Sequence, residues 1–300
     1  MSTPSAADEC TLDTCSVSDS FWGYRPNLGI DIFFAIVYAA VIAYCLFVSV
    51  VKRVWLSYTI SILIGALLEL IGFIFRIYGY FDPFVRIAWI IQYSLITFAP
   101  VFTSAAIYVC IGRIADYLGR GVFNIRPRLY ARIFIPSDIF ALLIQASGGG
   151  VSFTEEVSLD GGVSTGQSII IAGLALQVVS LTVFLFLFLG VLWPTNLFRT
   201  NKYGKLDAED RRTKNFTIFV FIAILLIIGR SGFRVAEYSE GIFGTLGHNE
   251  VLFIIFDGFP MAIASSLLVI FHPMHMLPTT SRASKFVGQE LRFLPEDQES

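Results

Sequence analysis

The chain has 300 residues, of which 55% are hydrophobic and only 15% charged, and its formal net charge is −2. Its mean hydropathy of +0.72 excludes an ordinary soluble globular protein and predicts a polytopic membrane protein. The charge balance, with no basic tract, gives no reason to expect a nucleic-acid partner. The first ten residues, MSTPSAADEC, have neither a basic region nor an apolar core, so we expect no cleaved signal peptide.

Seven apolar stretches are long enough to cross a bilayer core, which takes about 20 helical residues. In chain order they cover residues 28–50, 56–79, 86–112, 129–148, 167–192, 215–235 and 250–272. The fourth has the weakest pattern, because it contains Arg132, Pro136 and Asp138, and we expect the glycines at 148–150 to end it. We therefore predict an all-α integral membrane protein, a seven-transmembrane-helix bundle. A segment 1–27 precedes the membrane domain 28–275, and a polar, disordered tail 276–300 follows it.

Basic residues gather in alternate loops and so predict the orientation. Lysine and arginine occur after the first, third and fifth stretches and in the tail, whereas residues 149–166 and 236–249 contain neither. By the positive-inside rule the N-terminus is outside and the C-terminus cytosolic. Cys10 and Cys15 would then lie outside, where a disulfide is permitted, although two free thiols fit the sequence as well.

Ionisable side chains inside the predicted spans are costly, and they are the candidates for function. Arg230, Arg234 and Glu237 have i, i+4, i+7 spacing and share a helix face. With the predicted orientation, nearly all the embedded charge falls in the outer half of the membrane. We interpret it as a polar cavity towards the outer leaflet, lined by the first, second, sixth and seventh helices. The candidate substrate-binding residues are Glu69, Arg76, Asp138, Arg230, Arg234, Glu237 and Asp257, and Asp31 is also embedded. The alternative interpretation is structural ion pairs that hold helices together.

Several stretches then resemble a known family in order along residues 22–275. The longest is RVAEYSEGIFGTLGHNEVLFIIFDGFPMAIASSLLVIFHP, from Arg234. The others are WGYRPN, ELIGFIFR, APVFTSAAIYVCIGRI, PSDIFALLIQASGGG and AGLALQ. Together they resemble the fungal lipid-translocating exporters, the resistance-to-aminocholesterol proteins.

This resemblance implies a seven-helix protein with its N-terminus outside, a plasma-membrane location, and export of an amphipathic lipid such as a sphingoid long-chain base. Other members of that family are associated with sterol-analogue resistance or porphyrin transport. A sphingoid base is a cationic amphipath, so Glu69, Glu237 or Asp257 could receive its ammonium group, and Arg76, Arg230 or Arg234 could hold a phosphate instead. The chain has no phosphate-binding loop of the G-x-x-x-x-G-K-[ST] type, so we expect no ATP hydrolysis of its own.

Two other functions share parts of this pattern. A seven-helix lipid or small-molecule receptor would have the same topology and could use the same cavity. An integral membrane lipid hydrolase is the enzymatic alternative, but His248 and His272 are 24 residues apart, about 36 Å along a helix, and cannot share one metal ion. We therefore expect no enzyme activity, no metal and no cofactor. The expected partner is a membrane lipid or another amphipathic small molecule, and the sequence leaves the oligomeric state open.

Overall fold

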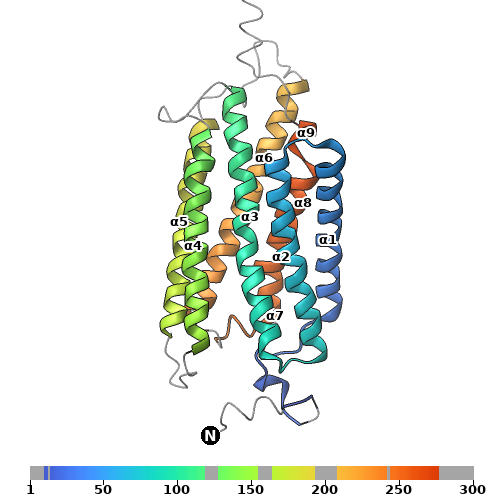
Figure 1. Ribbon diagram of the computed structural model, residues 1–300, viewed down its shortest axis with the longest axis vertical. Helices are drawn as coiled ribbons and strands as arrows, with labels where there is room; N and C mark the ends of the chain where they lie inside the picture. Colours follow the sequence, from blue (N-terminus) through green and yellow to red (C-terminus); the bar gives the residue numbers. More distant parts are fainter. Residues whose placement is uncertain are drawn as a thin grey trace, which may run out of the picture.

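The computed structural model describes residues 10–12, 14–118, 128–154, 164–192, 208–241 and 244–276. The chain folds into a bundle of long, roughly parallel helices (Figure 1). In chain order the elements are η2 (Val17–Asp19), α1 (Leu28–Phe47), the π turn η3 (Val48–Lys52), α2 (Leu56–Phe81), α3 (Arg86–Leu118), α4 (Arg128–Thr154), α5 (Thr165–Leu192), α6 (Ala208–Ser239), α7 (Glu250–Phe253), the π turn η6 (Ile254–Gly258), α8 (Phe259–Ile270) and α9 (Pro273–Met276).

Seven helical segments in the described part of the chain are long and apolar enough to span a membrane. This result confirms the predicted seven-helix, all-α architecture of an integral, multi-pass membrane protein. The last segment, Glu250–Ile270, combines α7, η6 and α8 in one continuous span. The predicted tail lies outside the described residues from position 277 onwards, as do the basic loop positions at 119–127 and 193–207.

The helices are arranged so that α3 runs through the middle of the bundle in Figure 1, with α4 and α5 side by side on one flank and α1 on the other. The central place of α3 agrees with its burial, since its span is the most enclosed of the seven. We call the end at which α1 begins the Leu28 end. α2 and α6 finish at this end and α7 begins there (Figure 1).

Two asparagines start helices at the Leu28 end. The Asn27 side chain accepts hydrogen bonds from the main-chain N–H groups of Gly29 and Ile30, and Asn249 caps α7 in the same way. An asparagine in this position satisfies donors that the first helical turn leaves free. The first and last spans therefore both begin with a cap encoded in the sequence.

The glycines at 148–150 do not end α4, contrary to our expectation, because the helix continues to Thr154. Gly148 faces α5, where a Cβ atom would lie 2.6 Å from the Gly166 carbonyl oxygen. Gly149 and Gly150 point into open space. In an apolar medium a helix is the way to satisfy main-chain groups, so α4 continues through all three glycines, and Gly148 is a close-packing position instead of a terminus.

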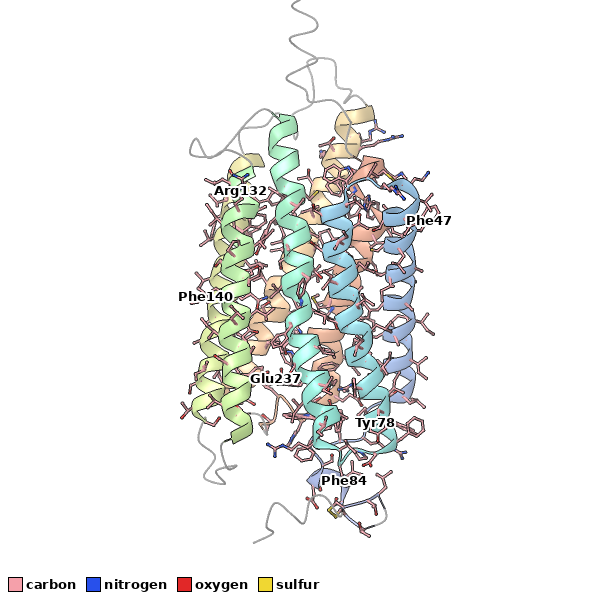
Figure 2. All side chains as sticks on the ribbon, viewed as in Figure 1. Phe47, Tyr78, Phe84, Arg132, Phe140 and Glu237 are labelled. Carbon is pink, nitrogen blue, oxygen red and sulfur yellow. A yellow bond between two sulfur atoms is a disulfide. The ribbon has the colours of Figure 1, made fainter. Side chains whose placement is uncertain are left out.

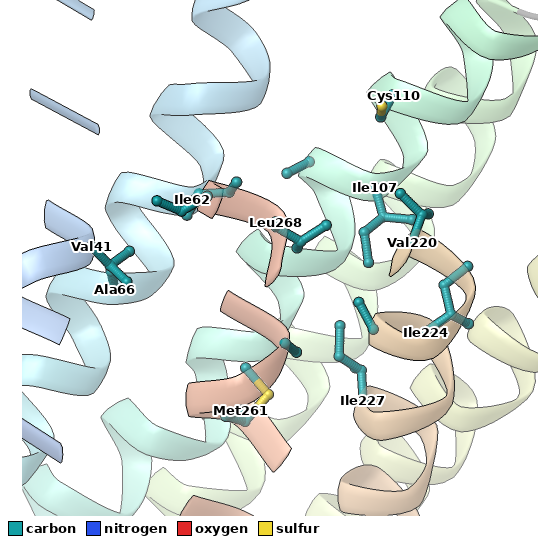
Figure 3. Packing of buried hydrophobic residues seen from close by; sticks show 14 of the residues in the cluster. Val41, Ile62, Ala66, Ile107, Cys110, Val220, Ile224, Ile227, Met261 and Leu268 are labelled. Atoms are coloured by element: carbon teal, nitrogen blue, oxygen red, sulfur yellow. The ribbon is translucent and has the colours of Figure 1, made fainter. Parts of the chain in front are cut away.

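Apolar side chains fill the interior and also cover the outside. Inside, Ile107 of α3, Val220 and Ile224 of α6 and Leu268 of α8 converge (Figure 3). Outside, Phe140 of α4 and many other large apolar side chains are exposed, as Figure 2 shows. A helix that is apolar on all sides is typical of a membrane span.

The segment before α1 packs onto the Leu28 end of the bundle. Cys10 and Cys15 form a disulfide, which resolves the question that the sequence left open. Trp22 is 2% exposed and donates a hydrogen bond from its indole nitrogen to Gln92 of α3 at 3.1 Å. Its ring lies against Gly79 of α2, where a Cβ atom would be only 2.8 Å from the indole.

Candidate functional site

Six of the seven predicted binding residues gather in the interior between α1, α2, α6 and the last span. They are joined there by Asp31 and Glu250, and none of the six is more than 3% exposed. We call this group the arginine cluster. It consists of Asp31, Glu69, Arg76, Arg230, Arg234, Glu237, Glu250 and Asp257. Figure 2 shows Glu237 inside the bundle, near the Leu28 end.

Asp257 is the centre of the cluster, because it contacts two arginines of α6. Arg234 donates from Nε to Oδ1 and from Nη2 to Oδ2 of Asp257, both at 2.8 Å. Arg230 Nε lies 2.6 Å from the same Oδ1, as an ion pair without hydrogen-bond geometry. Arg234 also donates from Nη1 to Glu237 at 2.9 Å. This two-pronged geometry between an arginine and a carboxylate is the strong form of such a pair.

The placement of Asp257 depends on the π turn η6. A π turn inserts an extra residue into a helix and changes the direction of the side chains around it, often at functional sites. Pro260 follows the turn and lacks the N–H that would bond to the carbonyl of Phe256. Gly258 lets the turn approach α1, since a Cβ atom there would lie 2.8 Å from the Phe34 ring.

Arg230 makes a further contact, with the main chain of α3. Its Nη2 donates to the carbonyl oxygen of Ile96 at 2.6 Å. In a regular helix this oxygen would accept from the N–H of residue 100, but residue 100 is a proline. The guanidinium group therefore supplies the donor that Pro100 lacks, which is how a proline becomes tolerable inside a membrane helix.

Arg76 connects the first, second and last spans. Its Nε donates to Asp31 at 2.8 Å, and its Nη2 donates to Glu250 at 2.9 Å and to the Tyr24 hydroxyl at 3.1 Å. The Phe253 ring lies 4.2 Å from the Arg76 guanidinium carbon and 5.5 Å from that of Arg234, so one aromatic ring contacts both halves of the cluster. Burial raises the pKa of the Tyr24 phenol despite the opposing charge of Arg76, which keeps that hydroxyl protonated.

Glu69 differs from the other carboxylates of the cluster. It is 2% exposed and forms no ion pair with any described residue, and its Oε1 has no hydrogen-bond partner among them. The charged groups that interact with the Glu69 carboxylate through space are Arg230, Asp257 and Arg234. The hydroxyl of Tyr38 on α1, which interacts electrostatically with Glu69, is also buried and has no hydrogen-bond partner in the described part of the chain. Buried polar atoms of this kind are uncommon, and they identify positions where a further group could bind.

Asp138 does not belong to the arginine cluster. It is 1% exposed and accepts a hydrogen bond from the Tyr108 hydroxyl of α3 at 2.7 Å, between α3 and α4. The predicted binding set is therefore divided between two sites. Asp138 was grouped with the others only because it is ionisable and embedded, and neither property states which helix it faces.

Sequence reasoning missed Glu250, Tyr24 and Tyr93. Glu250, the first residue of the predicted seventh stretch, was not selected as an embedded charge, although it accepts hydrogen bonds from both Arg76 and the main-chain nitrogen of Asn27. The ring of Tyr93 on α3 lies 4.8 Å from the Arg234 guanidinium carbon. The sequence did contain a signal for Glu250. It lies in the first turn of the last span, and the first and last spans begin at the same end of the bundle, so its carboxylate can reach the start of α1.

The expected cavity is also seen differently in the structure. The sequence predicted charged groups facing an open polar space, whereas the structure shows each arginine directed at a neighbouring carboxylate or carbonyl oxygen. Removing one residue of a buried ion pair lowers the free energy of unfolding by on the order of 3–5 kcal/mol, because the other charge is left buried and unpaired. These contacts therefore connect the spans that contribute the two partners. These contacts fit the structural interpretation that the sequence left open for Arg76, Arg230 and Arg234, and a role of the cluster residues in substrate binding stays a prediction.

Comparison with known proteins agrees with the family resemblance of the sequence. The family described as RTA1 like protein matches residues 62–280. The sphingoid long-chain base transporter RSB1 of Saccharomyces cerevisiae (strain ATCC 204508 / S288c) is 31% identical over 295 residues, covering 87% of this chain and 76% of that protein. Protein RTA1 of the same strain is 29% identical over 240 residues, covering 78% and 71%. Protoporphyrin uptake protein 1 is 28% identical over 200 residues, covering 66% and 63%. No solved structure matches the chain.

Proposed function

The chain belongs to the RTA1-like family, and on that premise we propose that it moves an amphipathic lipid across a membrane without hydrolysing ATP itself. The substrate that we propose first is a sphingoid long-chain base. A relative that is 31% identical over most of both chains is named as a transporter of such bases. The physical support from this chain is a buried carboxylate, Glu69, whose Oε1 has no hydrogen-bond partner among the described residues.

Charge favours a cationic headgroup at this position. The inner part of the cluster contains two arginines, Arg230 and Arg234, and three acids, Glu69, Glu237 and Asp257. With all five ionised its formal charge is +2 − 3 = −1. One ammonium group neutralises that charge, and a hydrogen bond to a charged group contributes about 1.5–3 kcal/mol.

An anionic headgroup is disfavoured by the same contacts. Arg234 is already occupied by Asp257 and Glu237, and Arg76 by Asp31 and Glu250. A phosphate would have to displace a carboxylate that already bonds to the guanidinium group. We therefore assign the ammonium role to Glu69 and a positioning role to the arginines. In the orientation proposed from the loop charges, the Leu28 end of the bundle faces outside, in the plasma membrane.

The test is transbilayer movement of a fluorescent sphingoid base in proteoliposomes without nucleotide. We expect Glu69→Gln to reduce movement at least tenfold, because the amide cannot balance an ammonium charge. Glu240→Gln makes the same chemical change at an exposed residue and should leave movement unchanged. An N-acylated base, which has no charge, should move poorly in all three proteins.

Two outcomes would contradict this proposal. Equal movement by wild type and Glu69→Gln would remove Glu69 from substrate binding. Saturable binding of the base with no movement above empty liposomes would exclude transport and favour the alternative of a seven-helix lipid sensor.

A further inference from the structure

A second polar site lies outside the arginine cluster, at the packing of α4 against α3 and α5. Its centre is Asp138, which is 1% exposed and accepts from the Tyr108 hydroxyl at 2.7 Å. The other oxygen of its carboxyl group, Oδ1, is buried and has no hydrogen-bond partner among the described residues. Unlike every acid of the cluster except Glu69, Asp138 forms no ion pair with a described residue.

The groups around Asp138 are neutral hydroxyls. Ser104 of α3 lies near Tyr108, and Ser180 of α5 lies near both Tyr108 and Asp138; both serine hydroxyl oxygens are buried without a hydrogen-bond partner among the residues that the structure describes. The titratable group that faces Asp138 from α3 is Tyr108, and Ser180 is the polar group from α5. On α4 itself, Arg132 is exposed at the surface.

This environment suits a carboxyl group that carries a proton. An ionised carboxylate buried without a counter-charge is very costly, whereas the protonated form has one donor and retains acceptor capacity. Tyr108 already donates to Oδ2, so a proton fits on Oδ1, and the Ser180 hydroxyl is the neighbouring group that could accept from it. Oδ1 of Asp138 and the Ser180 hydroxyl, which have no hydrogen-bond partner among the described residues, are therefore both available to a neutral carboxyl group.

The site is separate from the arginine cluster, yet one helix joins the two. α3 contacts Arg230 through the Ile96 carbonyl oxygen and contacts Asp138 through Tyr108. Twelve residues separate Ile96 from Tyr108, which is about 18 Å along a helix. Pro100 lies between them, at the point where α3 lacks a helical hydrogen bond.

We propose that Asp138 is a proton-binding site: it holds one proton on Oδ1 while α3, α4 and α5 enclose it, and it exchanges that proton with water when these helices separate. Binding takes a proton from a hydronium ion, forms an O–H bond on Oδ1 and neutralises the carboxylate; release breaks that bond, passes the proton to water and restores the negative charge on Asp138. This exchange couples the proposed lipid movement to a proton gradient across the membrane. That coupling rests on the proposed function, whereas proton binding by Asp138 does not.

Infrared spectroscopy of the purified protein tests the site without any transport assay. The protonated carboxyl group has a carbonyl stretch distinct from that of a carboxylate, and it shifts in heavy water. The band is measured in a Glu69→Gln background, because Glu69 is a second buried carboxyl group without an ion pair to a described residue. We expect the band at neutral pH in that background and its loss when Asp138→Asn is added. Asn keeps an acceptor for Tyr108, so the fold should be retained, which thermal unfolding checks. Asp19→Asn makes the same change at an exposed residue and should leave the band intact.

Two further measurements distinguish a proton site from a metal-cation site. Tyr108→Phe should shift the band without removing it, because the proton stays on the carboxyl group. A band unaffected by Asp138→Asn would overturn the proposal. Loss of the band on adding sodium at constant pH would assign the site to a metal cation, and would also overturn it.

The coupling is tested in proteoliposomes with opposite pH gradients. Wild-type movement of the sphingoid base should differ between the two directions, and Asp138→Asn should move it at equal rates in both. If the variant responds to the gradient as wild type does, Asp138 is not the coupling site. Absence of movement in every protein would contradict the proposed function, while the infrared result would still decide the proton site.

Discussion

Arg230 donates a hydrogen bond to the main-chain oxygen of Ile96, the oxygen that Pro100 leaves without its helical donor. The contact joins a side chain of α6 to the main chain of α3, and it satisfies two buried groups at once. The proline and the arginine are 130 residues apart in sequence, from position 100 to position 230, and neither alone indicates the other.

This contact predicts coupling between the two positions. Arg230→Met should lower the free energy of unfolding by on the order of 3–5 kcal/mol, since it leaves Asp257 and the Ile96 oxygen with one partner fewer. In a Pro100→Ala background the N–H of residue 100 can bond to Ile96, so the same change should cost about 1–3 kcal/mol less. Chemical unfolding of the four proteins in detergent measures the difference. Equal costs in the two backgrounds would show that Arg230 does not serve the Ile96 oxygen.

The three consecutive glycines of α4 give a matched series. Gly148→Ala should destabilise the protein by about 1–3 kcal/mol, because its Cβ would meet the main chain of α5 at Gly166 and Ile170. Gly149→Ala and Gly150→Ala enter open space and should stabilise it by up to about 1 kcal/mol through helix propensity. Melting temperatures of the three variants check this order. A Gly148→Ala protein as stable as the other two would mean that α4 and α5 are not in such close contact.

Asp31 and Glu250 share one arginine and should therefore compensate for each other. Each bonds to Arg76, at 2.8 and 2.9 Å. Removing one, in Asp31→Leu or Glu250→Leu, leaves the guanidinium with the other acid and with Tyr24. Removing both leaves a buried charge unpaired, so the double variant should lose about 0.5–3 kcal/mol more than the sum of the single losses. Additive losses would indicate that the two carboxylates act independently of Arg76.

His272 predicts a dependence of stability on pH. It lies beyond the last span, and burial lowers the pKa of its imidazole from 6.5 to about 4, with a smaller contribution from His275. Its Nδ1 accepts from the N–H of Met274 at 3.2 Å and its Nε2 is 3.1 Å from the Thr59 hydroxyl, so the folded state needs the neutral ring. The unfolded chain binds more protons between these two pKa values. Stability should therefore be fully present above about pH 6.5 and should fall as the pH drops towards 4.

The control for this prediction is a change at the neighbouring histidine. His272→Asn retains an acceptor for Met274 and should flatten the fall in melting temperature between pH 6.5 and 4. His275→Asn, at an exposed position, should retain most of it. The same slope in His272→Asn as in wild type would assign the pH dependence to another group.

Much of the fold could be predicted because membrane spans are read from length and hydropathy along the sequence. The seven spans and the family resemblance follow from such local patterns. Gly148 shows the limit of this approach: glycine next to glycine indicates a helix end in water, but in a membrane it allows two helices to approach closely. The distinction depends on what lies opposite, which is Gly166 of α5.

The candidate site could be predicted only as a list of residues. Burial and ionisable character selected the arginines and Glu69 correctly as interior groups, but the pairing depends on how the helices are rotated. Asp138 was grouped with Asp257, although the two occupy different sites. The π turn at Asp257 lies inside an apolar run and has no pattern in the sequence that would have indicated it.

The packing of the segment before α1 also affects how the charged interior can be reached. At the Leu28 end, Trp22 of this segment is bonded to Gln92, and Tyr24 is bonded to Arg76 itself. Arg25 adds a second attachment, donating to the Tyr80 carbonyl oxygen at 2.9 Å. These few residues cover the charged interior at the Leu28 end. If the chain moves an amphipath as proposed, we expect the molecule to enter from the side, between helices, with its hydrocarbon tail still in the surrounding lipid.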